Sequence, residues 1–267
     1  MKRVTRRRAL SLLAGGAAAR GLSPAAAHEE FHIPIRGRRQ TLRRMLGGSV
    51  GAGPSRKALL ASGDGGFHPF GDAIAERLAG WGFDVYQLDS QHYLSCFTGE
   101  TELTPEQAQE DFRALALDVQ AGDGLPLYCM GWSAGAALAA LAGAGEGMRP
   151  LLAGVVAVAL PLEGVLGWRW WDHLQFLPGF RAGGPYFSVE PYVAALAPLP
   201  LLALQSDQDR WVTPQDFQAI AAAAREPKKM VWLRAGGHSF PDARPEFFRA
   251  LREGLDWMGT ATPPESR

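Results

Sequence analysis

The chain has 267 residues, of which 47% are hydrophobic and 20% charged, with equal numbers of basic and acidic side chains. This composition supports one sizeable core and excludes intrinsic disorder. The 32 glycines and 19 prolines follow no period, which excludes a fibrous chain.

Residues 1–27 are expected to form an export signal of the twin-arginine kind. Arg6-Arg7-Arg8 precedes a weakly apolar, alanine-rich stretch that reaches Ala25-Ala26-Ala27, a small-residue cleavage pattern. A disordered basic tail is the alternative. Processing after Ala27 leaves residues 28–267 as one domain with 21 basic and 27 acidic residues, a net charge of −6. A periplasmic or secreted location is expected.

The remaining chain is expected to bind no nucleic acid, because it is acidic and has no basic stripe. Its longest apolar run, Leu151 to Leu162, is much shorter than the roughly 18 to 20 residues that a transmembrane helix needs. No metal, nucleotide or haem motif is found, so no cofactor is expected. Cys96 and Cys129 have neither metal-ligand nor redox spacing, and whether they pair is left open.

Strands and helices are predicted to alternate along residues 28–267, after short edge strands over Glu30 to Val50. The predicted strands are Lys57–Ala61, Phe83–Leu88, Leu125–Met130, Leu152–Leu160, Leu201–Gln205 and Lys229–Leu233. The predicted helices are Phe70–Leu78, Thr104–Val119, Ala134–Ala142, one that begins at Thr213, and Arg244–Met258. This alternation predicts an α/β fold with a mostly parallel sheet covered on both faces. Ligands bind such sheets at the carboxyl ends of the strands.

Gly131-Trp132-Ser133-Ala134-Gly135 is a G-x-S-x-G segment between a predicted strand and a predicted helix. A serine hydroxyl is a weak nucleophile, and a sharp turn of this kind exposes it beside a base and oxyanion donors. We therefore predict that Ser133 is the nucleophile and that the N–H of Ala134 is an oxyanion donor. A glycine turn with a bystander serine is the alternative, which the strand and helix on either side disfavour.

The predicted base is His238, which follows the last predicted strand and can change its charge near neutral pH. The acid that orients it is expected after the preceding strand. Asp209 is favoured over Asp207, because Val212 follows it at a spacing that packs under the loop. The order Ser, Asp, His is that of α/β-hydrolases.

The glycine-rich loop Ser62-Gly63-Asp64-Gly65-Gly66 is expected to supply the second oxyanion donor. Asp64 and Gly65 are equally good candidates, and an ordinary glycine turn is the alternative. Three aromatic side chains near these motifs are expected to contact substrate: Trp132, Phe67 and His68.

The elbow and the order of the triad resemble the α/β-hydrolase superfamily over nearly all of residues 28–267. Four segments also resemble the bacterial virulence VirJ/AcvB-type family: Ser62–Gly66, Leu88-Asp89-Ser90, Thr104 through Asp111, and Gly131–Ala136. That resemblance implies a periplasmic enzyme that removes the amino acid from aminoacyl-phosphatidylglycerol.

Residues 164–198 are expected to form a small cap over the site, and they are rich in aromatic residues. The segment holds Trp168, Arg169, Trp170, Trp171, Phe176, Phe180, Tyr186 and Phe187. Such side chains can contact a lipid interface or an acyl chain, which would give peripheral membrane contact. A lid packed on its own small core is an equal alternative.

Together these patterns predict a serine ester hydrolase that forms an acyl-enzyme and acts on a small-molecule or lipid ester. A general carboxylesterase or lysophospholipase is the alternative substrate class. Acyl transfer to an acceptor other than water would use the same residues. A non-catalytic binding module on the same fold is the remaining alternative.

Overall fold

The computed structural model describes residues 28–47, 53–99, 102–120, 122–176 and 183–261. The predicted export signal and Phe180 lie outside the described residues, and so does the side chain of Phe176. In the described part of the chain, no helix has both the length and the hydropathy needed to span a bilayer.

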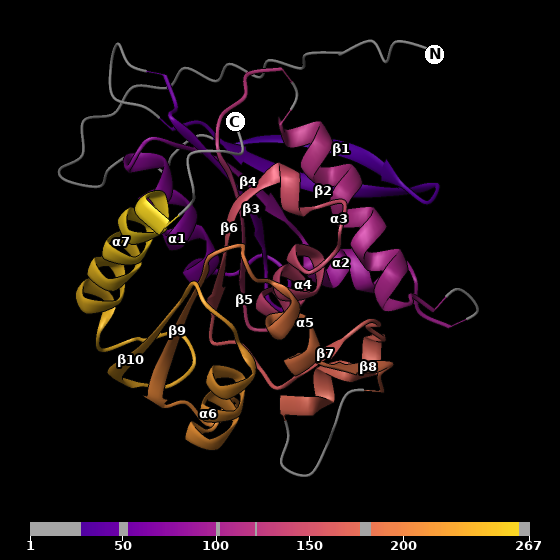
Figure 1. Cartoon of the computed structure of the whole chain (residues 1–267). Helices are drawn as coiled ribbons and strands as arrows, with labels where there is room; N and C mark the ends of the chain where they lie inside the picture. The colour runs from indigo at the N-terminus through magenta and orange to yellow at the C-terminus, as the bar shows by residue number, and fades with distance from the viewer. Residues whose placement is uncertain (1–27, 48–52, 100–101, 121, 177–182, 262–267) are drawn as a thin grey trace, which may run out of the picture.

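A mixed sheet of eight strands forms the centre of the described molecule (Figure 1). Its spatial order is β1-β2-β4-β3-β5-β6-β9-β10. The bounds are β1 Glu29–Ile35, β2 Arg38–Met45, β4 Phe83–Leu88, β3 Arg56–Ala61, β5 Leu127–Trp132, β6 Leu152–Val158, β9 Leu201–Gln208 and β10 Lys228–Gly236. The β1–β2 and β2–β4 pairs are antiparallel and the other pairs are parallel. The predicted mostly parallel sheet and its edge strands are confirmed.

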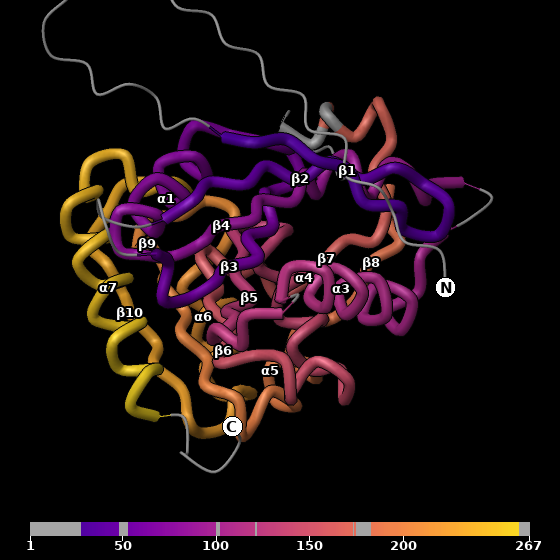
Figure 2. The backbone as a smooth tube through the Cα atoms, turned by 90° about the horizontal axis from the view of Figure 1, so that it is seen from above, coloured from indigo at the N-terminus to yellow at the C-terminus, as the bar shows by residue number. Residues whose placement is uncertain are grey.

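Helices cover both faces of this sheet (Figure 2). On one face lie α1 Pro69–Gly80 and α7 Arg244–Ala261. On the other lie α2 Ser90–Ser95, α3 Pro105–Gln120, α4 Ala134–Gly143, α5 Glu190–Ala195 and α6 Pro214–Ala223. The two predicted helix starts are capped as expected. Thr104 and Gln107 exchange reciprocal hydrogen bonds, and Thr213 and Asp216 form a capping box.

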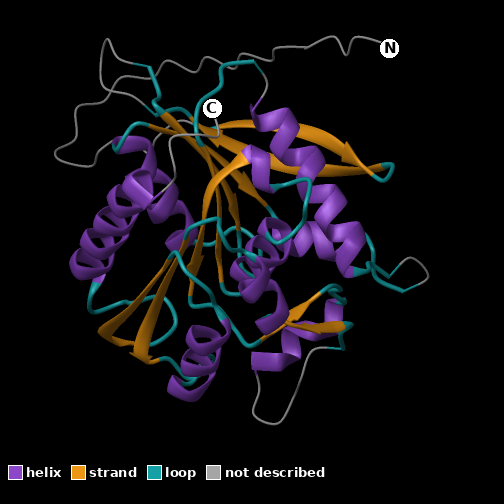
Figure 3. Ribbon diagram, viewed as in Figure 1, coloured by secondary structure: helices purple, strands orange, loops and turns teal. Residues whose placement is uncertain are grey.

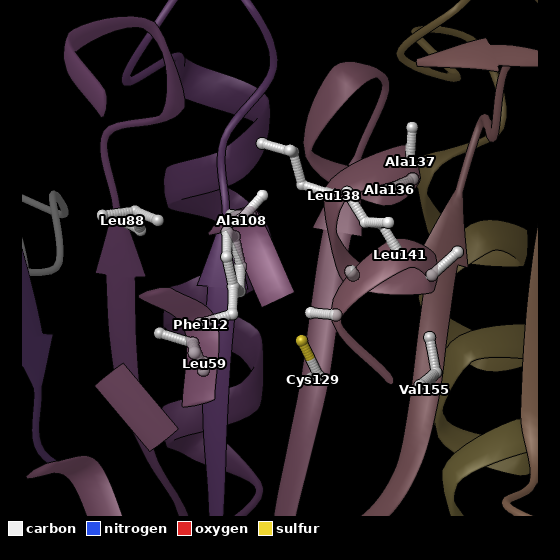
Figure 4. Close-up of a cluster of buried hydrophobic side chains, with 14 of the residues drawn as sticks. Leu59, Leu88, Ala108, Phe112, Cys129, Ala136, Ala137, Leu138, Leu141 and Val155 are labelled. Carbon is white, nitrogen blue, oxygen red and sulfur yellow. The ribbon is translucent and has the colours of Figure 1, made fainter. Parts of the chain in front are cut away.

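The larger core cluster lies between the sheet and α3 and α4 (Figure 4). Leu59 on β3 and Cys129 on β5 point toward Phe112 on α3 and Leu138 on α4, and all four are buried. Every residue of this alanine-rich helix is buried, because α4 packs on β5 and β6 on one side and against α3 and α5 on the other. Cys96 and Cys129 are both free, and burial raises the pKa of the Cys129 thiol to about 12.

The chain reverses its direction of winding between β3 and β5. From β3 it passes through α1 to β4 on one side, and it later returns to β5 on the other side of β3. The loops after β3 and β5 therefore diverge at a switch point, where doubly wound sheets bind their ligands. Gly63 follows β3 and Ser133 follows β5 at this point.

The predicted cap segment holds β7 Glu163–Val165, β8 Tyr186–Ser188 and the 3₁₀ helix η2 Trp170–Phe176. β7 and β8 form a separate two-stranded sheet (Figure 3). Trp168 and Phe187 are buried in the larger core cluster, so the described part of this segment packs on the main core. Trp170 and Trp171 remain 78% and 42% exposed.

Candidate active site

Ser133 stands at a sharp turn between β5 and α4. Its backbone has φ 58° and ψ −126°, a conformation that is strained for a residue with a side chain. The Ser133 N–H donates to the Val158 carbonyl of β6, and its carbonyl accepts from Ala136 N–H. The turn is therefore held at both sides by backbone hydrogen bonds.

The two glycines of the motif are required by close approach of backbone. A Cβ on Gly131 would overlap the Gly135 carbonyl, and a Cβ on Gly135 would overlap the carbonyls of Ala61 and Ser62. Without side chains at these positions, α4 can start directly against the ends of β3 and β5. The elbow is thus defined by excluded volume.

The predicted oxyanion loop lies beside the serine. Ala61 pairs with Gly131 in the parallel register, so the loop after β3 begins level with the elbow. The Gly63 position lies 3.6 Å from Ser133 Cβ, measured from an ideal Cβ on the glycine. Gly63 and Gly66 then pair across a tight turn that contains Asp64 and Gly65. Ala134 is the first residue of α4 and is 6% exposed.

His238 and Asp209 come from the loops after β10 and β9 and lie in direct contact. The His238 Nδ1 donates to Asp209 Oδ2 at 2.7 Å, and the Asp209 side chain is 0% exposed. Asp207 is placed elsewhere, because its carboxylate accepts from the Ala235 N–H at 3.0 Å. The structure therefore brings Asp209, and not Asp207, to the imidazole.

Four donors surround the Asp209 carboxylate. Besides His238, these are the backbone N–H groups of Trp211 and Val212 at 2.8 and 3.3 Å and the Gln205 amide at 3.1 Å. Burial alone would raise the pKa of Asp209, but His238, Trp211 and Gln205 outweigh it and lower that pKa. The carboxylate is therefore charged at neutral pH, as an acid that orients an imidazole must be.

Trp132 links the turn at Ser133 to the loop that carries His238. It directly precedes Ser133, its ring centroid lies 5.4 Å from that of His238, and its Nε1–H donates to the His238 carbonyl at 3.1 Å. Among the described residues, no hydrogen bond joins Ser133 to His238 directly. Such contacts are often loose before a substrate binds.

The other two predicted substrate contacts lie next to Trp132. The His68 ring is 5.0 Å from the Trp132 ring, and His68 also caps α1 through its Nδ1, which accepts from Phe70 N–H. Phe67 stacks under the guanidinium of Arg43 at 3.8 Å. Phe67, His68 and Trp132 all line one pocket beside the elbow. His68 therefore has a structural role that its sequence position did not reveal.

Two contacts at this site were missed from the sequence. They are the Trp132 hydrogen bond to the His238 loop and the Gln205 hydrogen bond to Asp209. A polar Gln205 directly after the apolar run Leu201–Leu204 was the available indication for the second. Within the described residues, no group of three or more His, Cys, Asp or Glu side chains is placed to hold a metal ion.

The chain was compared with known protein families, curated proteins and solved structures. No family model and no curated protein matches the sequence. Among solved structures, Est1E from Butyrivibrio proteoclasticus is similar with a TM-score of 0.66 and 15% identity, over 86% of this chain and 99% of that one. The esterase domain of a Rhodothermus marinus protein has a TM-score of 0.60 and 24% identity, over 87% and 99%.

A structure described as a membrane phospholipase A and bacterial virulence factor is also similar, with a TM-score of 0.60 and 17% identity over 88% of each chain. At these identities the similarity establishes architecture. Together with the parallel sheet and its two helical layers, it confirms the predicted α/β-hydrolase fold.

Proposed function

We propose that this α/β-hydrolase-fold protein is a serine hydrolase that cleaves carboxylic esters. The single observation that carries the proposal is that the Ser133 turn and the Asp209–His238 pair lie together at one edge of the sheet. Ser133 occupies a strained turn that only two flanking glycines permit, and Asp209 holds His238 at 2.7 Å beside Trp132, the residue before Ser133. The esterases among the similar structures support the same reaction class.

The proposed reaction proceeds in two halves. His238 accepts the Ser133 hydroxyl proton while the serine oxygen attacks the ester carbonyl, and the N–H of Ala134 with one loop N–H stabilises the oxyanion. The C–O bond to the alcohol breaks, and the imidazolium gives the alcohol its proton. Water then attacks the acyl-enzyme with His238 again as base, which releases the acid and restores Ser133.

The first test is covalent labelling with a fluorophosphonate probe, read by intact mass on residues 28–267. We expect one adduct on the wild type and none on Ser133→Ala. Ser188→Ala, which changes an exposed serine on β8, is the matched control and should label normally. No adduct on folded wild type would reject the proposed mechanism in favour of a binding module.

For the substrate we propose a lipid ester, with aminoacyl-phosphatidylglycerol as the leading candidate from the motif resemblance. The exposed Trp170 and Trp171 support this, since indole rings favour membrane interfaces. Their ring centroids lie 5.5 Å apart, and Leu174 beside them is 42% exposed. The phospholipase among the similar structures is a second support.

Sedimentation with phosphatidylglycerol vesicles tests the lipid proposal. We expect the wild type to bind the vesicles and the double variant Trp170→Ser with Trp171→Ser to stay in solution. The control Leu117→Ser, on the outer side of α3, should bind the vesicles as the wild type does. Labelling by the fluorophosphonate probe should be the same in both variants as in the wild type. Hydrolysis of soluble esters with no vesicle binding would favour the general carboxylesterase.

We also propose export through the arginine-rich N-terminus to the periplasm. The run Arg6-Arg7-Arg8 and the small residues at Ala25–Ala27 support it. Cell fractionation of the full chain should recover processed protein outside the cytoplasm. Replacing Arg6, Arg7 and Arg8 by Lys should retain the unprocessed chain inside, and equal export of that variant would reject a twin-arginine route.

A further inference from the structure

Gln205 is a buried amide beside the proposed triad, and the reaction described above does not use it. It ends the apolar run of β9 and is 0% exposed. Its Nε2 donates to Asp209 Oδ2 at 3.1 Å and also lies near the backbone carbonyls of Ser206 and Val212, at 3.2 and 3.3 Å. Asp209 Oδ2 is the same oxygen that His238 Nδ1 contacts at 2.7 Å. One oxygen therefore receives both the amide and the imidazole.

The other end of this amide is unfavourable for folding. Gln205 Oε1 is buried and has no hydrogen-bond partner in the described part of the chain. A buried acceptor without a partner costs free energy, and an apolar side chain of similar shape would avoid that cost. What the amide contributes is therefore its Nε2 contacts, which reach Asp209 and the two ends of the loop that carries it.

We propose that Gln205 is a positioning residue that fixes Asp209 Oδ2 toward His238 and moderates how strongly this carboxylate stabilises the charged imidazolium. This inference rests on the proposed function. Removing the amide donor leaves more negative charge on Oδ2, and a stronger negative charge favours the charged imidazole. A charged imidazole cannot accept the Ser133 proton. As pH falls, a variant without the amide would therefore lose activity at a higher pH than the wild type does.

The test is the rate of fluorophosphonate modification of Ser133, measured against probe concentration and pH. In Gln205→Met, we expect a limiting rate about tenfold lower with unchanged probe affinity, and an acid limb moved to higher pH. Gln40→Met is the matched control. Gln40 is also a 0% exposed amide, but it lies on β2 with both amide atoms unpartnered in the described residues, and its variant should keep the wild-type profile.

Gln205→Glu gives a second readout that does not depend on Gln205→Met being folded. The introduced carboxyl faces Asp209, donates to Oδ2 when protonated and repels it when charged. We therefore expect a rate that falls as pH rises, an alkaline limb that wild type lacks. The neighbouring Asp207, Asp242 and Arg210 are unchanged in every variant and contact Ala235 N–H, Gly236 N–H and the Trp211 ring.

The outcomes separate this inference from the proposed function. A labelled wild type together with a moved acid limb in Gln205→Met, or an alkaline limb in Gln205→Glu, supports it. A labelled wild type with wild-type profiles in the folded Gln205 variants overturns the inference alone. A wild type that is not labelled at Ser133 overturns the proposed function, and the inference with it.

Discussion

The proposed nucleophile half of the site, around Ser133, and the proposed acid–base half, around Asp209 and His238, hold their residues by different means. At the end of β5, Ser133 is fixed by backbone packed so closely that Gly131 and Gly135 admit no side chain. At the ends of β9 and β10, Asp209 and His238 are fixed by a network of hydrogen bonds. Changes in the first half should therefore affect folding, and changes in the second should affect rate.

The largest effect is expected in the acid–base half. Asp209→Asn keeps the shape of the side chain but favours the wrong imidazole tautomer, so ester hydrolysis should fall by about 10⁴-fold. Asp207→Asn is the matched control two residues away and should change the rate less than about threefold. Equal losses in both variants would mean that the acid was assigned to the wrong residue.

In the nucleophile half, Gly135→Ala is expected to destabilise the fold by about 3 kcal/mol, because its Cβ overlaps two backbone carbonyls. Chemical denaturation measures this. Gly65→Ala in the neighbouring loop meets no atom within 4 Å and should keep wild-type stability. If both variants were equally stable, the elbow would not be sterically defined.

A smaller effect is expected where the halves meet. Trp132→Phe keeps a ring between His68 and His238 but loses the N–H that donates to the His238 carbonyl. We expect a rate about tenfold lower from the loosened loop, with KM nearly constant. Trp232→Phe, on the edge strand β10, is the control. A rate equal to wild type would show that the halves are positioned independently.

The smallest effect concerns stability at acid pH. Because the pKa of Asp209 is lowered in the folded state, its stabilisation is present above the unfolded pKa of about 3.9 and is lost as pH falls through the folded value. Urea unfolding between pH 7 and pH 3 should therefore lose less stability in Asp209→Asn than in wild type. Parallel curves would contradict the lowered pKa.

The same contrast explains what the sequence could predict. Steric rules and helix caps act between residues close in sequence. The G-x-S-x-G segment, the capped helix starts at Thr104 and Thr213, and the strand and helix on either side of the elbow could therefore be predicted from the sequence. The spacing to Val212 favours Asp209 over Asp207, and the structure places Asp209 against His238.

Contacts between distant segments were not predictable in this way. The Trp132 bond to the His238 carbonyl spans 106 positions, and it depends on the register of strands that the sequence does not give. The same holds for Trp168, which is buried and whose backbone exchanges two hydrogen bonds with the Thr98 hydroxyl at a separation of 70. The helices α2 and α5 were too short for their periodicity to be recognised.

The two unpaired cysteines have a consequence for how the protein matures. Cys96 and Cys129 are both free. Cys129 is buried on β5 next to the elbow, and burial raises the pKa of its thiol to about 12. A thiol that stays protonated reacts slowly with oxidants and disulfides. The described fold therefore contains no disulfide whose formation would require an oxidant or an isomerase. Production without an oxidative step should give the same protein as production with one.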